Sequence, residues 1–360
     1  MVKKSIDNYN VYGGQSFDRQ TDRQTGKVRS RNITLDIYKG LLIILVVLRH
    51  VLQYSVSDEG GIITNFIWAV QMPGFMLVAG YFAARKVDNW SVAGKRILLS
   101  AQHYALPFFT WFILVDVLLL GKMDRNPLTG LGQLLTHVDG GLWFLWVVFV
   151  LSIIFTLANR ELSSKSGKLI KAGAVFIGCF GILLLIGKMA GINFLGIKYI
   201  LYYAVYYGFG WLVKWTEAWW KQWWPRVKNT AMFLCLAVFL AIVFNFDLYH
   251  TGDGIVSISM RAIAGFTGNA VLLTICEKYM EVLSKAKLNE LGMYTLEIYA
   301  THVYVVKLME MGDRFFTIAG FGTFVCSLIL TAMITTVIIA TFKAIPMADF
   351  IFYGKKIRSQ

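Results

Sequence analysis

Charged residues, proline and cysteine are all scarce in this sequence. Only 16% of its 360 residues are charged and five are proline, whereas a soluble domain of this length needs a larger charged surface. Intrinsic disorder is excluded as well, because 57% of the residues are hydrophobic and 15% are aromatic. We therefore expect a membrane protein whose apolar side chains face lipid.

The four cysteines, Cys179, Cys235, Cys276 and Cys326, lie apart from one another inside apolar runs. None belongs to a CxxC pair or has a histidine at the spacing of a metal ligand, so we expect neither a disulfide framework nor a bound metal. The net charge of +14 does not indicate a nucleic-acid partner, because the basic residues are spread between apolar runs.

Ten apolar runs have about the length needed to cross roughly 30 Å of hydrocarbon as helices. They are residues 33–54, 62–84, 97–120, 142–158, 172–187, 199–213, 231–246, 255–276, 291–308 and 318–342. The predicted fold class is therefore all-α, a polytopic integral membrane helix bundle with about ten transmembrane helices. The predicted domains are a disordered cytoplasmic tail at 1–31, a transmembrane domain at 32–346 and a cytoplasmic C-terminal tail at 347–360.

The lysines and arginines predict the direction of the spans, since cytoplasmic loops carry an excess of both. Alternate segments, beginning with the N-terminal tail and ending with the C-terminal one, hold 25 of these residues, and the loops between them hold five. Both termini are therefore expected in the cytoplasm. The predicted inner loop at 214–228 also contains five tryptophans, whose rings favour the headgroup layer.

Ionisable residues inside spans are costly and nominate a functional site by default. The first span carries Asp36, Lys39, Arg49 and His50. Lys39 and His50 are eleven residues apart, a spacing that returns to the same helix face within about 20° and separates them by about 16 Å. Asp36 precedes Lys39 by three residues, at which a carboxylate can hold an ammonium. One polar stripe is thus predicted to face the bundle interior.

A basic residue, ten intervening positions and a histidine on the first helix resemble the signature of the membrane acyltransferase-3 family, which O-acylates bacterial surface glycans. Lys39 as the basic residue resembles the fucose 4-O-acetylase-like branch. Other segments agree with the family in order: Gln71-Met-Pro-Gly-Phe at the start of 71–82, the basic pair at 95–96 before 106–111, Leu-Trp-Phe-Leu-Trp at 142–146, and 291–302 ending in Tyr-Ala-Thr-His. The resemblance covers roughly residues 31–356.

This resemblance implies an O-acyltransferase, most simply an O-acetyltransferase, in the cell membrane. Acetyl-CoA would be the cytoplasmic acyl donor, and a hydroxyl of a cell-surface or lipid-linked polysaccharide the acceptor. His50 is the candidate base or transient acyl carrier, since a neutral imidazole can take a proton from a sugar hydroxyl. Lys39 and Asp36 complete the candidate catalytic residues, although Lys39 could meet the donor's phosphates or only neutralise Asp36.

Arg96, with Lys95 and Arg85, is the candidate donor-binding group, because a pyrophosphate favours bidentate guanidinium contacts. The alternative is that these three belong to an ordinary basic inner loop.

Four further residues are candidates for the substrate site: Arg49, Gln71, Glu297 and His302. Arg49 stands where the family usually has glycine, Gln71 where it has histidine, and Ala79 where it has serine.

Two other functions stay open. A secondary transporter or glycan flippase would also have about ten spans, but it should show internal repeats and paired broken helices, which the sequence lacks. A catalytically inactive partner subunit would fit Gln71 and Ala79. The expected partners are the lipid bilayer, acyl-CoA and a glycan, and the oligomeric state stays open.

Overall fold

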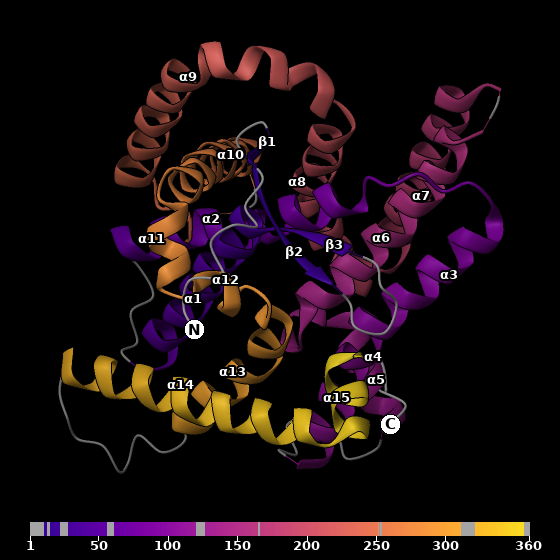
Figure 1. The fold of residues 1–360 in the computed structure, drawn as a ribbon. Coiled ribbons are helices and arrows are strands. Elements are labelled where there is room, and N and C mark those ends of the chain that lie inside the picture. Colours follow the sequence, from indigo (N-terminus) through magenta and orange to yellow (C-terminus); the bar gives the residue numbers. More distant parts are fainter. Residues whose placement is uncertain are drawn as a thin grey trace. The chain divides into compact units, whose positions relative to one another are not determined.

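The computed structural model describes residues 11–12, 15–21, 28–55, 61–119, 127–164, 166–250, 252, 254–310 and 321–355. The chain divides into two compact units, both mainly helical (Figure 1). The first comprises Met1–Phe75 and Trp224–Met333, and the second comprises Met76–Trp223 and Ile334–Gln360. Three helices run from one unit into the other: α2 (Ile62–Ala83), α9 (Glu217–Asn245) and α14 (Phe321–Ala344).

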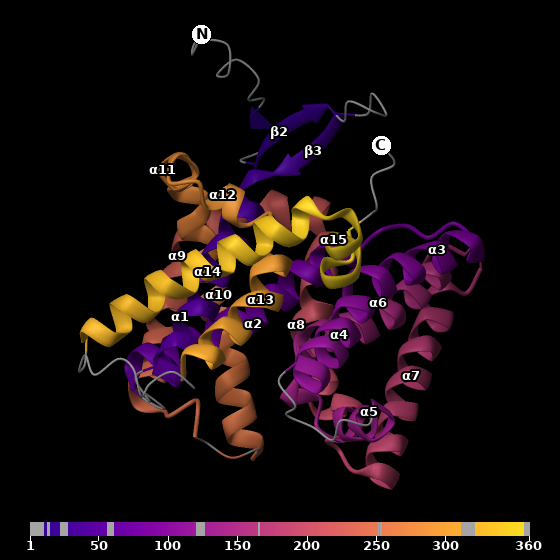
Figure 2. The same cartoon turned by 90° about the horizontal axis from the view of Figure 1, so that it is seen from below.

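The first unit is arranged around α1 (Ile33–Ser55). Four helices pack against it: α10 (Ile255–Lys278), α11 (Met280–Lys285), α12 (Leu288–Leu291) and α13 (Thr295–Glu310) (Figures 1 and 2). A separate apolar cluster joins the parts of α2 and α9 in this unit to α10. It consists of Ala69, Val70, Phe239, Ile242, Val243, Leu248 and Ala264.

Two glycines allow α1 to meet α12 and the residue after it at backbone distance. A Cβ added at Gly292 would lie 1.8 Å from the carbonyl oxygen of Asp36, and one added at Gly40 would lie 2.2 Å from that of Leu288. Small residues of this kind are what permits close helix contacts in membranes. The start of α1 is thereby fixed against the segment that leads into α13.

The N-terminal segment contains short strands where the structure describes it. Strands β1 (Val11–Tyr12), β2 (Gln15–Thr21) and β3 (Val28–Asn32) form an antiparallel sheet in the order β1-β2-β3 (Figure 1). Thr21 pairs with Val28 at one end of the β2–β3 ladder. Hydropathy did not indicate these strands, because a backbone ladder forms without an apolar core pattern.

The second unit packs around α6. Its helices are α3 (Trp90–Ser100), α4 (Leu106–Thr110), α5 (Pro127–Thr136), α6 (Trp143–Leu162), α7 (Lys168–Ala190), α8 (Ile197–Trp215) and α15 (Pro346–Tyr353), with 3₁₀ turns η3 (Val138–Gly140) and η4 (Phe194–Gly196). Helix α6 contacts α3, α4, α7 and α8. Here too glycines permit a close crossing: a Cβ added at Gly80 would lie 1.9 Å from the Tyr207 oxygen.

Helix α3 continues through two π-helical segments, η1 (Ala101–Ala105) and η2 (Trp111–Leu119), which flank α4. Pro107 lies in this run, lacks a backbone N–H and interrupts the regular α-helical ladder. Helix α15 is tied to the run by the indole of Trp111, which donates to the Phe352 oxygen at 3.0 Å.

The prediction of a membrane helix bundle is confirmed at the level of its helices. Seven described helices are long and apolar enough to cross a membrane: α2, Trp90–Val117, α6, α7, α9, α10 and Gly322–Ala344. The remaining three predicted spans are also helical, as α1, α8 and α13. The count of ten and the cytoplasmic side of the termini stay predictions.

Candidate functional site

A contact between two histidine rings joins α1 to α13 in the first unit. Nε2 of His302 lies 3.0 Å from Nδ1 of His50, and the two ring centroids are 5.0 Å apart. His302 is 1% exposed and His50 is partly buried. The sequence predicted each histidine as a site residue, but it did not predict that they touch.

The backbone oxygens around His50 and His302 indicate which ring nitrogens carry a proton. Nδ1 of His302 lies 2.7 Å from the Ile298 oxygen, so it carries the proton and leaves Nε2 of His302 as an acceptor. Nδ1 of His50 faces that acceptor and also the Val46 oxygen at 3.0 Å, so it donates. Nε2 of His50 is then the unprotonated nitrogen, as a general base requires.

Arg49, adjacent to His50, is almost completely buried. It is 3% exposed, and its guanidinium carbon lies 4.8 Å from the ring centroid of Tyr249. Tyr249 in turn meets Trp68 edge-on at 6.4 Å, and Arg261 lies 5.1 Å from the Trp68 ring. The rings of Tyr249 and Trp68 thus lie in contact between two guanidinium groups, next to His50, a cluster that the sequence did not predict.

The loop that carries Tyr249 is held in place by α2. The Asn65 amide donates to the Phe246 oxygen at 2.9 Å, and its oxygen accepts from the Leu248 N–H at 3.1 Å. The start of α2 and the α9–α10 connection therefore lie together, as expected if both are on the same side of the membrane. The start of α2 adjoins one loop predicted to be extracytoplasmic, and the α9–α10 connection is another.

Asp36 and Lys39 lie near the opposite end of α1. Nζ of Lys39 is 2.7 Å from the Asp36 carboxylate, and Nε of Arg31 is 3.3 Å from it. Lys39 and Asp36 thus form the ion pair that their three-residue spacing predicts. His50 lies about 16 Å away along the helix axis, so the three predicted catalytic residues form two separate groups.

The other two substrate-site candidates are buried on separate helices. Glu297 is 1% exposed on α13, five residues before His302. Gln71 is 6% exposed on α2, and its side-chain oxygen is buried without a hydrogen-bond partner in the described part of the chain. One turn later, a Cβ added at Gly74 would lie 2.5 Å from the side-chain oxygen of Asn269. That oxygen accepts from the Tyr38 hydroxyl at 2.5 Å.

Arg96 belongs to the second unit and has a structural role there. Its guanidinium donates to the Arg85 oxygen at 3.1 Å and to the Lys86 oxygen at 2.7 Å. These bonds close the connection between α2 and α3, to which Arg85 contributes its carbonyl group. The side chains of Arg85 and Lys95 are exposed. Arg96, one of the three residues predicted to bind the acyl donor, therefore already makes hydrogen bonds within the chain.

A cavity of about 440 Å³ opens next to this connection. It is lined by Lys86, Asp88, Leu162, Ser163, Ser164, Lys168 and Trp215. These residues come from the α2–α3, α6–α7 and α8–α9 connections, which the charge count predicts to be cytoplasmic. The sequence does not predict this cavity, because its lining residues lie far apart along the chain and share only their place in basic inner segments.

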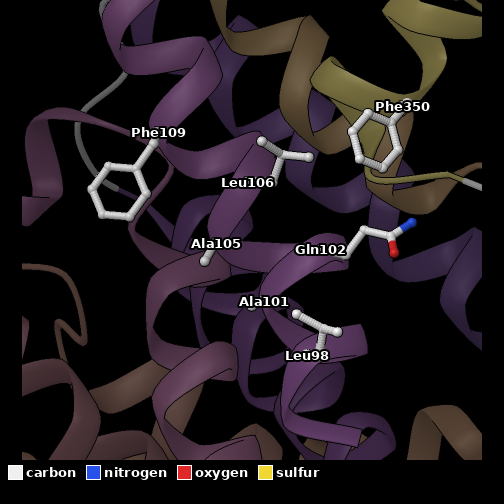
Figure 3. Close-up of a pocket in the computed structure, with 7 residues that line it drawn as sticks. All are labelled: Leu98, Ala101, Gln102, Ala105, Leu106, Phe109 and Phe350. Atoms are coloured by element: carbon white, nitrogen blue, oxygen red, sulfur yellow. The ribbon is translucent and has the colours of Figure 1, made fainter. Parts of the chain in front are cut away.

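A second cavity, of about 390 Å³, is lined by apolar side chains along the π-helical run and by Phe350 (Figure 3). Its polar member is Gln102, whose amide donates to the Gly354 oxygen at 3.0 Å. This hollow has no acid, base or nucleophile among its lining residues. In the described part of the chain, no group of three or more metal-binding side chains occurs.

Known proteins resemble this chain in sequence. A family model described as an acyltransferase domain matches residues 32–341. Nodulation protein NolL of Sinorhizobium fredii is 32% identical over 140 residues, which is 36% of this chain and 38% of that protein. NolL of Mesorhizobium japonicum is 31% identical over 144 residues, with the same shares. The matched region thus spans well under half of either relative.

No solved structure matches this chain. The family match extends from the start of α1 almost to the end of α14 and so includes both histidines and the cavity next to the α2–α3 connection. This chain belongs to the membrane acyltransferase-3 family.

Proposed function

We propose that this protein is an O-acetyltransferase that moves an acetyl group from cytoplasmic acetyl-CoA to a hydroxyl of a cell-surface or lipid-linked polysaccharide. The observation that carries the proposal is the contact between His50 and His302, which leaves Nε2 of His50 as a free base. Family membership supplies the reaction class. The acetyl group, the CoA donor and the polysaccharide acceptor are the proposed parts.

In the proposed reaction, Nε2 of His50 accepts the proton of the acceptor hydroxyl as its oxygen bonds to the thioester carbonyl carbon. The carbon–sulfur bond then breaks, and the sulfur takes the proton from the imidazolium, which gives an ester and the free thiol. His302 holds the His50 ring by accepting from its Nδ1–H. Its own Nδ1–H is fixed on the Ile298 oxygen, so it is a positioning residue.

The cavity at the α2–α3 connection supports a nucleotide donor. Lys86 and Lys168 are among its lining residues, and ammonium groups bind phosphate oxygens. Trp215 offers a ring on which a base can stack. Arg96 positions this site through its bond to the Lys86 carbonyl.

Lysines at opposite ends of α7 allow a matched test of this donor site. Lys168→Ala is expected to weaken acetyl-CoA binding by about 10- to 100-fold, because a charged hydrogen bond contributes about 1.5–3 kcal/mol. Lys188→Ala removes an exposed lysine at the other end of the same helix and should leave the affinity unchanged. Isothermal titration with CoA on detergent-purified protein measures both, and equal affinities would rule out this donor site.

The reaction itself is tested by radiolabelled acetyl-CoA. Purified protein in proteoliposomes should transfer label to a polysaccharide acceptor and release free CoA thiol in equal amount. A transporter or flippase would move glycan without labelling it. An inactive partner subunit would bind CoA and label nothing unless a second protein is added.

The orientation of the chain is a separate expectation. We place both termini in the cytoplasm of a cell with this protein in its plasma membrane, because 25 basic residues lie in one set of segments and five in the other. Reporter enzymes fused before Met1 and after Gln360 should both be active in the cytoplasm. An external C-terminus would mean an odd number of spans.

A further inference from the structure

Arg49 carries a buried positive charge that no acidic side chain balances in the described part of the chain. It is 3% exposed, and its Nη1 is buried without a hydrogen-bond partner there. A guanidinium remains charged at any pH that proteins tolerate. A buried charge without a partner is costly, so the site is built at some expense of stability.

The neighbouring groups do not neutralise it. Tyr249 offers Arg49 a ring at 4.8 Å, which attracts the charge but accepts no hydrogen bond in the guanidinium plane. The one acid in the described part of the α9–α10 connection, Asp247, is engaged elsewhere. Its carboxylate accepts from Nδ1 of His250 at 2.7 Å and from the N–H groups of Tyr249 and His250 at 3.0 and 2.9 Å.

Those bonds also affect the acidity of Asp247. The N–H of His250, followed by the other donors, lowers the pKa of this carboxyl below its usual value. Asp247 is therefore ionised and held by its own loop at neutral pH. Two further basic side chains lie in this region of the described chain: Arg261 over Trp68, and Lys307 at 5.8 Å from the Tyr54 ring. Neither can balance the charge of Arg49.

Arg49 directly precedes His50, and both lie near the end of α1 at which the predicted extracytoplasmic connections gather. We propose that Arg49 binds an oxyanion of the acyl acceptor, a carboxylate or a phosphate, and so makes the protein selective for anionic acceptors. This inference rests on the proposed function. The planar guanidinium fork matches either oxyanion in a bidentate contact. An acceptor held there would present a nearby hydroxyl to His50.

A ligand-binding test on the purified protein needs no acyl transfer. Thermal unfolding midpoints are measured in detergent with inorganic phosphate, D-glucuronate or D-glucose, each at about 10 mM, since a bound ligand raises the midpoint. The wild type should be stabilised by phosphate, glucuronate or both, and not by glucose. A response to phosphate alone indicates a phosphate-bearing acceptor, and a response to glucuronate alone indicates an acidic sugar.

The variant Arg49→Met tests whether Arg49 binds these anions. It should lose every anion response and, without any ligand, unfold at a higher temperature than the wild type, because an uncompensated buried charge has been removed. Arg49→Lys should retain a weaker response. Lys188→Met, which removes an exposed charge, should behave as the wild type. Identical responses of wild type and Arg49→Met to all three probes would overturn the proposal.

A lower midpoint of Arg49→Met without ligand would also overturn it, since the charge would then be balanced within the chain. Acceptor selectivity is the second readout. An acidic oligosaccharide should be acetylated with a kcat/KM at least about 10-fold above that of its carboxyl-reduced form, and Arg49→Met should erase the difference. A failure of transfer with both acceptors leaves the midpoint test intact, so the two proposals fail separately.

Discussion

Replacing His50 by glutamine is expected to lower polysaccharide acetylation by about 10²- to 10⁴-fold, the contribution of a well-placed general base. Glutamine keeps a hydrogen-bonding side chain next to His302 but cannot take the acceptor's proton. Acetyl-CoA binding and the unfolding midpoint should stay near wild-type values. Initial rates with radiolabelled acetyl-CoA, at several acceptor concentrations, measure the effect, which should fall on kcat.

Two further variants separate chemistry from structure. His302→Gln should reduce kcat by a smaller factor, because His50 remains but its ring is no longer fixed by the Nε2 acceptor. His250→Gln removes an exposed histidine bonded to Asp247 and should leave the rate unchanged. His50→Ala should regain part of its activity with added imidazole. Near-normal turnover of His50→Gln would show that the histidine pair is only a structural bond between helices.

Replacing Gly292 by valine is expected to have the largest effect on stability. Even the first atom of the side chain would lie 1.8 Å from the Asp36 oxygen, and only a shift of the α1 backbone could make room. Overpacking of this kind costs about 1–3 kcal/mol and occasionally more, so most of the protein should be lost from the membrane fraction. Fluorescence-detected size exclusion and thermal unfolding measure the loss.

A helical glycine with free space around it provides the control. No atom lies within 4 Å of a Cβ added at Gly94 in α3, so Gly94→Ala should be neutral or slightly stabilising, by up to about 1 kcal/mol. Gly40→Ala should fall between the two, since its Cβ would lie 2.2 Å from the Leu288 oxygen. Wild-type stability of Gly292→Val would show that α1 and α12 separate at little cost.

Much of the helical architecture could be predicted from the sequence, because each span is a local pattern. A run such as 172–187 is apolar enough to indicate a helix without knowledge of its neighbours, and α7 contains it. Lys86 and Lys168, both predicted on one side of the membrane from the charge count, line one cavity. The pair Asp36 and Lys39 followed from helical spacing.

The rest depends on contacts between distant residues. The sequence shows His50 and His302 as two isolated polar residues 252 positions apart, and only the packing of α13 on α1 brings them to 3.0 Å. Arg96 resembled a ligand contact, but its reach to the Arg85 and Lys86 carbonyls depends on how the chain turns after α2. Backbone acceptors of this kind have no side-chain signature.

The contact between Gly40, Gly292 and the facing carbonyl groups also restricts motion. To slide by one helical turn, about 5.4 Å, α1 would have to lift away from α12, because backbone already touches backbone there. Sliding of α1 along α12 in small steps is therefore blocked. Helix α1, which carries His50, is held in place against the segment that leads into α13, which carries His302. Under the proposed function, a donor and an acceptor would therefore have to reach His50 without any sliding movement between α1 and α12.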